Sequence, residues 1–220
     1  MKKTAILIGA TGLTGSILLQ KLLQHPDFEL IKVLTRRSTG ITSPKLEEHI
    51  VDLLKLESYQ HLFKGTVVYC CIGTTKAKTP DKDLYFKIDY GIPVAAAKLA
   101  KEQGIPTYVV ISSFGSNPDS KIFYSRTKGK MEKAVEAEQI PNTYILRPSL
   151  IVGDRKETRI GERIGELFFR IFNFLIPKSY RYIKAETIAE AMVKLEEVGY
   201  PKMYIPSDEI KKIASNQMQQ

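Results

Sequence analysis

Residues 9–15 read GATGLTG, and this glycine-rich stretch lies between an apolar run, Ala5–Ile8, and a segment whose leucines have helical spacing. A strand, a glycine turn and a helix in this order are typical of a turn that holds a pyrophosphate. Gly9 permits the tight turn, Gly12 lets the backbone approach the anion, and Gly15 lets the helix lie close to the strand. Glycine turns also occur as plain loops, but this one has both flanks, so we expect a bound dinucleotide.

Short β-rich runs recur along the chain and alternate with helical patterns. They lie at Leu30–Leu34, His49–Val51, Val67–Cys71, Tyr108–Ile111, Tyr144–Leu146 and Met203–Ile205. This alternation predicts right-handed crossovers and a parallel sheet covered by helices on both faces. The 220 residues fit one doubly wound α/β domain, a Rossmann fold, whose ligand binds at the carboxyl ends of the strands.

The composition, 43% hydrophobic and 26% charged, is that of an ordinary globular domain. A net charge of +9 is compatible with nucleic acid, an anionic membrane or a phosphorylated cofactor. The chain has no nucleic-acid-binding motif, so we expect no nucleic-acid partner. No apolar run reaches the roughly 18 residues that a membrane span requires. These features predict a cytoplasmic protein.

The cysteines and histidines give no sign of a disulfide or a metal site. Cys70 and Cys71 are adjacent in an apolar strand, where their side chains point to opposite faces and cannot easily pair. His25, His49 and His61 are dispersed without ligand spacing. We expect two reduced core cysteines and no metal.

The residues that follow the second run indicate which dinucleotide is bound. An enzyme that uses NAD commonly has an acidic residue there to hold the adenosine ribose hydroxyls, whereas this chain has Arg36 and Arg37. Guanidinium groups form charge-assisted, bidentate hydrogen bonds with a 2′-phosphate. The pair predicts NADP in preference to NAD, although two solvated loop arginines are the alternative.

Three further strand ends carry candidate ligand contacts. Asp52 and Leu53 follow the third run, where a carboxylate could meet the adenine amino group and an apolar side chain its ring. Gly73 and Thr74 follow the fourth, beside the expected nicotinamide half of the cofactor. The fifth run is followed by Ser113.

Tyr124 and Lys128 stand four residues apart in a helix that we expect over residues 123–139, and therefore share one face. A phenol has an ordinary pKa of about 10, and a nearby ammonium group favours its phenolate form. Tyr124 is thus a candidate proton-transfer group, and Lys128 is the residue expected to lower its pKa. Tyr180 and Lys184 have the same spacing but lie beyond the flanking strands, so we interpret them as a chance match.

Taken in order, GATGLTG, LTRR, CIGTT, ISS, YSRTK and LRPSLIVG resemble an atypical short-chain dehydrogenase/reductase over most of the chain. CCIGTTKAK and the stretch from ISSFGSN to LRPSLIVG are most similar to the family of the HIV Tat-interactive protein oxidoreductase and its small bacterial relatives. Those relatives are Rossmann-fold proteins that bind NADPH. The resemblance therefore implies NADP as the cofactor.

The resemblance also assigns roles to individual residues. It implies a pyrophosphate loop formed by Gly9, Thr11, Gly12, Leu13, Thr14 and Gly15. It implies a 2′-phosphate site at Arg36 and Arg37, adenine contacts at Asp52 and Leu53, a cofactor-side loop at Gly73 and Thr74, and a nicotinamide wall at Pro148, Ser149 and Leu150. The implied catalytic set is Ser113, Tyr124 and Lys128, of which Tyr124 and Lys128 also contact the cofactor.

One position departs from the superfamily pattern. Where many of these enzymes have an Asn that supports a proton relay, this chain reads KIDYG over residues 87–91, so Asp89 is the matching residue. It could hold a water chain or be an ordinary helix carboxylate, and we leave it outside the catalytic set. Ser112 is the alternative to Ser113 if the strand end differs by one residue.

These residues predict an NADPH-dependent oxidoreductase that transfers hydride to a carbonyl of a small organic substrate. Ser113 would orient the carbonyl oxygen, Tyr124 would donate the proton, and Lys128 would tune Tyr124 and hold the nicotinamide ribose. The alternative is a regulatory or sensor protein that binds NADPH without significant turnover, because the family includes regulators. Sugar-nucleotide epimerisation ranks last, because little chain follows Pro148 to build a substrate domain.

Residues 154–184 form the expected substrate-side or lid insertion. Within them, residues 163–176 have helical spacing with an unusually wide apolar face. We favour a lid that closes the active site and excludes water. The alternatives are that this apolar face forms the interface of a homodimer, or that it contacts an anionic membrane surface. We expect the protein to be a monomer or a homodimer.

Overall fold

The computed structural model describes residues 2–153 and 182–217. It contains a seven-stranded parallel sheet in the order β3-β2-β1-β4-β5-β6-β9, which confirms the doubly wound Rossmann architecture. The strands are β1 (Lys3–Ile8), β2 (Phe28–Thr35), β3 (Leu46–Ile50), β4 (Val67–Cys70), β5 (Thr107–Ile111), β6 (Asn142–Arg147) and β9 (Tyr204–Pro206).

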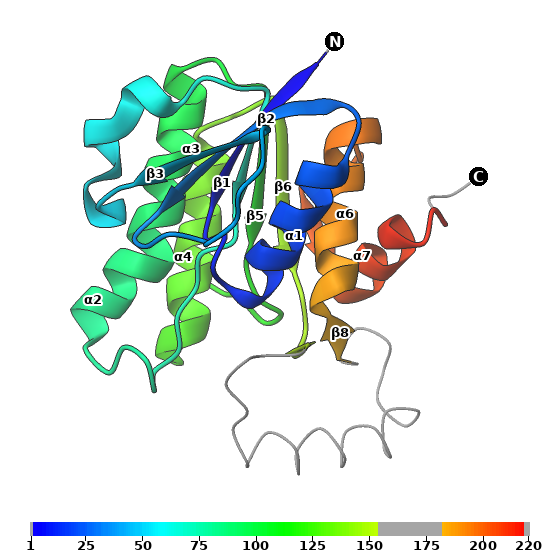
Figure 1. Cartoon of the computed structure of the whole chain (residues 1–220). Coiled ribbons are helices and arrows are strands. Elements are labelled where there is room, and N and C mark those ends of the chain that lie inside the picture. Colours follow the sequence, from blue (N-terminus) through cyan, green and yellow to red (C-terminus); the bar gives the residue numbers. More distant parts are fainter. Residues whose placement is uncertain (1, 154–181, 218–220) are drawn as a thin grey trace.

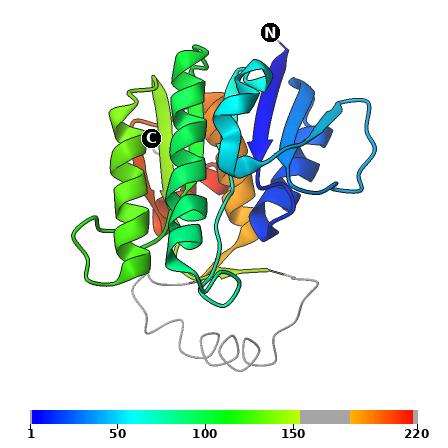
Figure 2. The same cartoon turned by 90° about the vertical axis from the view of Figure 1, so that its left-hand side faces the viewer.

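Helices cover both faces of the sheet. They are α1 (Leu13–Gln24), α2 (Lys82–Phe86), α3 (Ile92–Glu102), α4 (Phe123–Ala137), α6 (Ala185–Val198) and α7 (Ser207–Ala214), with a 3-10 segment η1 (Leu53–Leu62) and a π-helical turn η2 (Lys87–Gly91). Helices α1, α6 and α7 lie on one side of the sheet, and α2, α3 and α4 lie on the other (Figures 1 and 2). Two cores result, one on each face of the sheet.

Successive residues of the central strands alternate between these cores, as the pleat requires. In β1, Leu7 belongs to the core beneath α1 and α6, whereas Ile6 and Ile8 belong to the core beneath α3 and α4. The same alternation separates the two cysteines, which are both free: Cys70 lies in the α3 and α4 core, and Cys71 packs against the opposite one. The expectation that they point to opposite faces is confirmed.

The edge strands differ from the central ones. Strand β3 reads LEEHI and is only partly buried, and it begins at Leu46, three residues before the start that its apolar content predicted. The opposite edge, β9, has three residues and ends at Pro206. The apolar-run criterion missed the beginning of β3 because an edge strand has less contact with the core and tolerates charged residues.

The chain between β6 and α6 is described only at its ends. Ile151–Val152 (β7) and Ile183–Lys184 (β8) pair in parallel as a separate two-stranded sheet. The expected lid helix over residues 163–176 and the second tyrosine, Tyr180, lie outside the described residues. Among the described helices, none is long and apolar enough to cross a membrane.

Candidate cofactor-binding and active site

The glycine turn after β1 has no room for side chains at two positions. Gly9 has φ +91°, and a Cβ atom there would lie 2.8 Å from the backbone carbonyl of Cys71. A Cβ on Gly15 would lie 2.1 Å from the carbonyl oxygen of Gly9. Both distances are shorter than van der Waals contact, so a larger residue at Gly9 would push the turn away from the segment after β4, and one at Gly15 would push α1 away from the turn. The contacts match the roles that the sequence assigned to Gly9 and Gly15.

The first turn of α1 is suited to an anion. Its N-cap residue is Gly12, no side chain caps the helix, and the first turn contains no acidic residue. The N–H groups there have no helical partner, and the positive end of the helix dipole points in the same direction. The turn adjoins the ends of β1 and β4, where the amide of Cys71 donates to the carbonyl of Ile8 at 2.8 Å. This is the point where the strand order reverses, and a pyrophosphate fits it.

The candidate adenosine contacts follow β2 and β3. Arg36 and Arg37 are exposed directly after β2, and the Thr35 hydroxyl donates to the Arg37 carbonyl at 2.8 Å, which shapes this bend. Asp52 accepts a hydrogen bond from the amide of Leu54 at 3.0 Å and so caps η1. The side chain of Leu53 packs into the core beneath α3 and is 3% exposed, so little of it is available to an adenine ring.

Lys128 of α4 lies in a buried ion pair. Its Nζ is 3.0 Å from Oδ1 of Asp89, and the two side chains are 5% and 1% exposed. Burial alone would lower the pKa of Lys128, but the Asp89 carboxylate, with a smaller contribution from Tyr124, outweighs that effect and raises the pKa above its usual value. Lys128 is therefore charged at neutral pH. Its Nζ also lies 3.5 Å from the carbonyl oxygen of Ile111, where β5 ends.

Asp89 reaches this position from the π-helical turn η2. The second oxygen of its carboxylate accepts a hydrogen bond from the amide of Thr74 at 2.8 Å, and a Cβ on Gly73 would lie 3.7 Å from the first. One buried carboxylate thus joins Lys128 to the loop after β4. Isolated π turns are rare and often occur at functional sites. The sequence singled out Asp89 only by its match to an Asn position and did not indicate its partner.

Ser113 and Tyr124 lie at the same edge of the sheet. Because β5 ends at Ile111, Ser112 is the first residue after the strand; it is buried, and its hydroxyl donates to Glu132 of α4 at 2.5 Å. The next residue, Ser113, is half-buried, and its hydroxyl donates to the carbonyl of Phe114 at 3.2 Å. Tyr124 stands in the first turn of α4 with 42% of its surface exposed. Ser113 is therefore the accessible serine of the two.

The segment after β6 lies beside the loop that carries Ser113. The amide of Phe114 donates to the carbonyl of Pro148 at 2.8 Å. The hydroxyl of Ser149 lies 3.0 Å from that of Ser207, and the Leu150 side chain is exposed. The fold thus brings together the strand ends that carry Gly9, Thr74, Ser113 and the segment 148–150.

One group of potential metal ligands, His25, Asp27 and Glu197, lies elsewhere. Their ligand atoms are within 4.8 Å of one another, near the end of α1 and away from the carboxyl ends of the strands. Both ring nitrogens of His25 already have partners: Nε2 lies 2.7 Å from Glu197, and Nδ1 accepts from the amide of Asp27 at 3.3 Å. Their contacts are those of ordinary surface hydrogen bonds.

The fold and the glycine turn define a dinucleotide-binding protein of the Rossmann class. Residues 9–195 match a protein-family model whose description is NAD(P)H-binding. The chain belongs to this NAD(P)H-binding family, and its resemblance to the atypical short-chain dehydrogenases/reductases is confirmed.

The relatives include proteins of fungi and mammals. Protein FMP52, mitochondrial, of Candida glabrata is 34% identical over 206 residues, which cover 90% of this chain and 82% of that protein. Protein HTATIP2 of Rattus norvegicus is 31% identical over 171 residues, which cover 76% of this chain and 70% of that protein. The second match agrees with the resemblance to the HIV Tat-interactive protein family.

Solved structures with the same fold include sugar-nucleotide enzymes. The UDP-glucose 4-epimerase of Thermotoga maritima aligns with a TM-score of 0.70 at 14% identity and covers 97% of this chain and 82% of that chain. The Bordetella bronchiseptica enzyme WbmH in complex with NAD+ aligns with a TM-score of 0.69 at 16% identity and covers 90% and 73%. At these identities the likeness establishes the fold alone.

The expectation of a cytoplasmic protein is wrong. The FMP52 relatives in six fungal species, at 32–36% identity, are named mitochondrial. A folded Rossmann domain has the same composition in either compartment, so composition and the lack of an apolar span could not decide between them.

Proposed function

We propose that the protein is an NADPH-dependent oxidoreductase that reduces a carbonyl group of a small organic substrate. The observation that carries this proposal is the buried Lys128–Asp89 pair, with Nζ and Oδ1 3.0 Å apart. It holds a charged ammonium one helical turn from Tyr124, at the sheet edge that also carries the glycine turn. Ionisable groups whose pKa is shifted by burial and a specific charge partner cluster at functional sites, and Lys128 is such a group.

In the proposed reaction, bound NADPH supplies the hydride to the carbonyl carbon. Ser113 donates a hydrogen bond that orients the carbonyl oxygen, and Tyr124 transfers its phenolic proton to that oxygen, which gives the alcohol. The resulting phenolate of Tyr124 is exposed enough to recover a proton from water. Lys128 stabilises the phenolate electrostatically, while Asp89 fixes the direction of the ammonium group.

The proposed preference for NADPH over NADH depends on Arg36 and Arg37. Both side chains are exposed at the carboxyl end of β2, where the adenosine ribose lies in this fold. Each can donate bidentate, charge-assisted hydrogen bonds to a 2′-phosphate. Arg36 follows Thr35, the last residue of β2, directly, so a basic residue stands where NAD enzymes commonly have the acidic one that binds the ribose hydroxyls.

The proposed function is tested by NADPH oxidation against a panel of aldehydes, ketones and quinones. Tyr124→Phe should leave NADPH affinity within about twofold and lower turnover by roughly 100-fold or more, because only the transferable proton is removed. Tyr180→Phe serves as the control and should leave turnover unchanged. If NADPH binds tightly and wild-type protein consumes it with no carbonyl in the panel, the regulatory or sensor function replaces the enzyme.

A further inference from the structure

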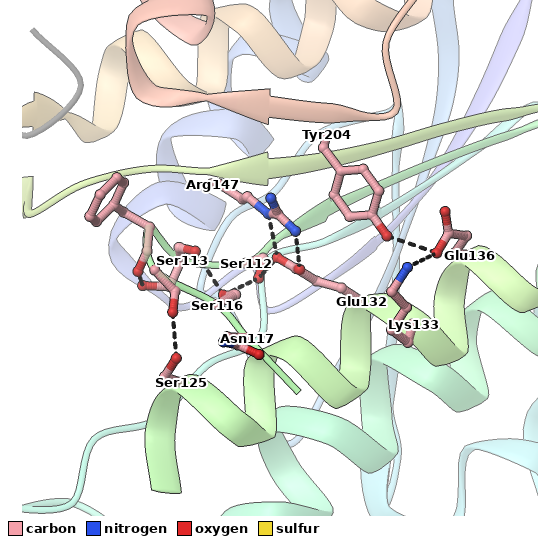
Figure 3. Close-up of polar contacts among 12 residues, drawn as sticks. Ser112, Ser113, Ser116, Asn117, Ser125, Glu132, Lys133, Glu136, Arg147 and Tyr204 are labelled. Atoms are coloured by element: carbon pink, nitrogen blue, oxygen red, sulfur yellow. Dashed lines mark hydrogen bonds and ion pairs between the residues drawn. The ribbon is translucent and has the colours of Figure 1, made fainter. Parts of the chain in front are cut away.

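A buried carboxylate, Glu132, lies between the segments that carry the proposed catalytic residues but is not one of those residues. Glu132 is 2% exposed and stands one turn after Lys128 and two turns after Tyr124 in α4. Arg147, the last residue of β6, binds it through two hydrogen bonds: Nε to Oε1 at 3.0 Å and a terminal nitrogen to Oε2 at 2.6 Å. The Ser112 hydroxyl donates to Oε1 at 2.5 Å (Figure 3). Glu132 thus joins α4, β6 and the loop after β5.

The contact with Ser112 continues through the turn that carries Ser113. The hydroxyls of Ser112 and Ser116 are 3.1 Å apart, and the Ser116 hydroxyl donates to the carbonyl oxygen of Ser113 at 2.7 Å. Figure 3 shows these groups together between Arg147 and the Ser113 backbone. Each serine hydroxyl has a single proton, which Ser112 gives to Glu132 and Ser116 gives to Ser113, so the two hydroxyls are in contact without a hydrogen bond between them. The position of Ser113 is therefore coupled to the Glu132 carboxylate through the neighbouring residue Ser112, and the Ser116 hydroxyl holds the other side of the turn.

The same loop is also fastened to the start of α4. The Ser125 hydroxyl donates to the carbonyl of Gly115, and the amide of Asn117 donates to the carbonyl of Ser125 at 3.1 Å. A Cβ on Gly129 would lie 2.2 Å from the nitrogen of Pro118, so the loop lies directly on the helix backbone. These contacts hold the far side of the loop on α4, and the hydrogen bond from Ser112 to Glu132 holds its beginning.

Stability alone is a weak reason for such a pair. Buried ion pairs can often be replaced by apolar residues of similar volume without loss of stability, because desolvation offsets the Coulomb attraction. A bidentate pair does, however, fix geometry, since the planar guanidinium and the carboxylate match in only a few orientations. The Arg147 guanidinium is further fixed by the Tyr204 ring, whose centroid lies 4.3 Å away.

We propose that Glu132 is a positioning residue that, held by Arg147, sets the Ser112–Ser116 turn and so places the Ser113 hydroxyl relative to Tyr124. The proposal rests on the proposed function, in which Ser113 and Tyr124 both act on the carbonyl oxygen. Glu132 itself touches neither substrate nor cofactor in this scheme. Its effect on the reaction passes entirely through Ser112 and the turn.

The test compares Glu132→Gln with Glu136→Gln, the same substitution one turn further along α4. Glu136 accepts hydrogen bonds from Tyr204 at 2.9 Å and Lys133 at 2.7 Å but does not contact Ser112, so it is a matched control. Three quantities are measured: kcat and KM for carbonyl reduction, NADPH affinity by titration calorimetry, and hydrogen–deuterium exchange of the peptide covering residues 112–118.

For Glu132→Gln we expect kcat to fall by roughly 10- to 100-fold, the range expected when a reacting group is misplaced by about 1 Å, with NADPH affinity within twofold. Exchange in residues 112–118 should accelerate at least fivefold, while peptides from β1 and β4 stay unchanged. Glu136→Gln should alter neither kcat nor this exchange. Should Glu132→Gln fail to fold, Ser112→Ala decides, because it leaves the Glu132–Arg147 pair intact and removes only the link to the turn.

Unchanged kcat together with unchanged exchange of residues 112–118 would overturn the proposal. So would an acceleration of exchange spread over the whole protein with a parallel loss of NADPH affinity, because that result marks a purely structural role. If wild-type protein reduces no carbonyl, the proposed function has failed. The exchange of residues 112–118 then still decides whether Glu132 orders the turn.

Discussion

The Lys128–Asp89 pair leads to a prediction about stability that needs no substrate. In Asp89→Asn, the side-chain oxygen can still accept from the amide of Thr74, but the ammonium of Lys128 loses its negative partner. With both side chains at least 95% buried, little solvent is available to replace it. Breaking a buried pair from one side costs about 3–5 kcal/mol, so the free energy of unfolding at pH 7 should fall by roughly that amount.

The stability that Asp89→Asn loses should depend on pH, and the direction of this dependence shows whether the uncompensated charge of Lys128 is the cause. In the wild type, Asp89 raises the pKa of Lys128, so the stability from this pair is present below the unfolded value of about 10.4 and is lost as pH rises through the folded value. In Asp89→Asn only burial remains as a strong influence, and it lowers the pKa of Lys128. The folded variant then binds fewer protons than the unfolded chain, and its stability rises with pH. The deficit should therefore narrow between pH 7 and pH 10.

Urea unfolding followed by circular dichroism measures this, since the chain has no tryptophan. The double variant Asp89→Asn/Lys128→Met should recover most of the loss, because it removes both charges. Glu102→Gln breaks the exposed pair with Lys98 and should cost less than about 1 kcal/mol. A deficit below 1 kcal/mol in Asp89→Asn, or one that widens as pH rises, would refute the assignment of Lys128 as a buried, charged group.

Two further predictions concern the cofactor site. We expect the wild-type protein to bind NADPH at least tenfold more tightly than NADH, since one charge-assisted contact contributes about 1.5–3 kcal/mol. The double variant Arg36→Ala/Arg37→Ala should lose this preference. Equal affinities of the wild-type protein for the two cofactors, measured by titration calorimetry, would contradict the 2′-phosphate site. Gly15→Ala should abolish NADPH binding and lower Tm, because its Cβ would lie 2.1 Å from the Gly9 carbonyl oxygen, whereas Gly91→Ala, which meets no atom within 4 Å, should leave both nearly unchanged.

Local patterns were sufficient to predict the sheet and the glycine turn. The run before Gly9, its spacing to Gly15 and the alternation of short strands with helices are all readable within a few residues, and parallel strands bring their carboxyl ends together as a rule. The placement of Ser113 and Tyr124 at one edge followed from the same rule. The beginning of β3 was missed because its edge position admits charged residues.

The two buried carboxylates could not be assigned in the same way. Asp89 meets Lys128 from a π turn between α2 and α3, and regular helical spacing does not foresee such a turn. Glu132 meets Ser112 and Arg147 across 20 and 15 positions, through tertiary packing. In both cases a carboxylate in a helix has the same local pattern whether it faces water or a buried cation.

The charged edge of the sheet affects aggregation. An exposed strand offers unpaired N–H and C=O groups to a strand of another molecule, and natural proteins oppose this with charge, proline and short length. Strand β3 carries Glu47, Glu48 and His49 in succession, with Glu48 accepting from the amide and hydroxyl of Thr39 at 2.7 and 2.6 Å. At the opposite edge, β9 is short and ends in Pro206, which has no N–H to donate. Neither edge of the seven-stranded sheet is therefore a good template for intermolecular β-pairing.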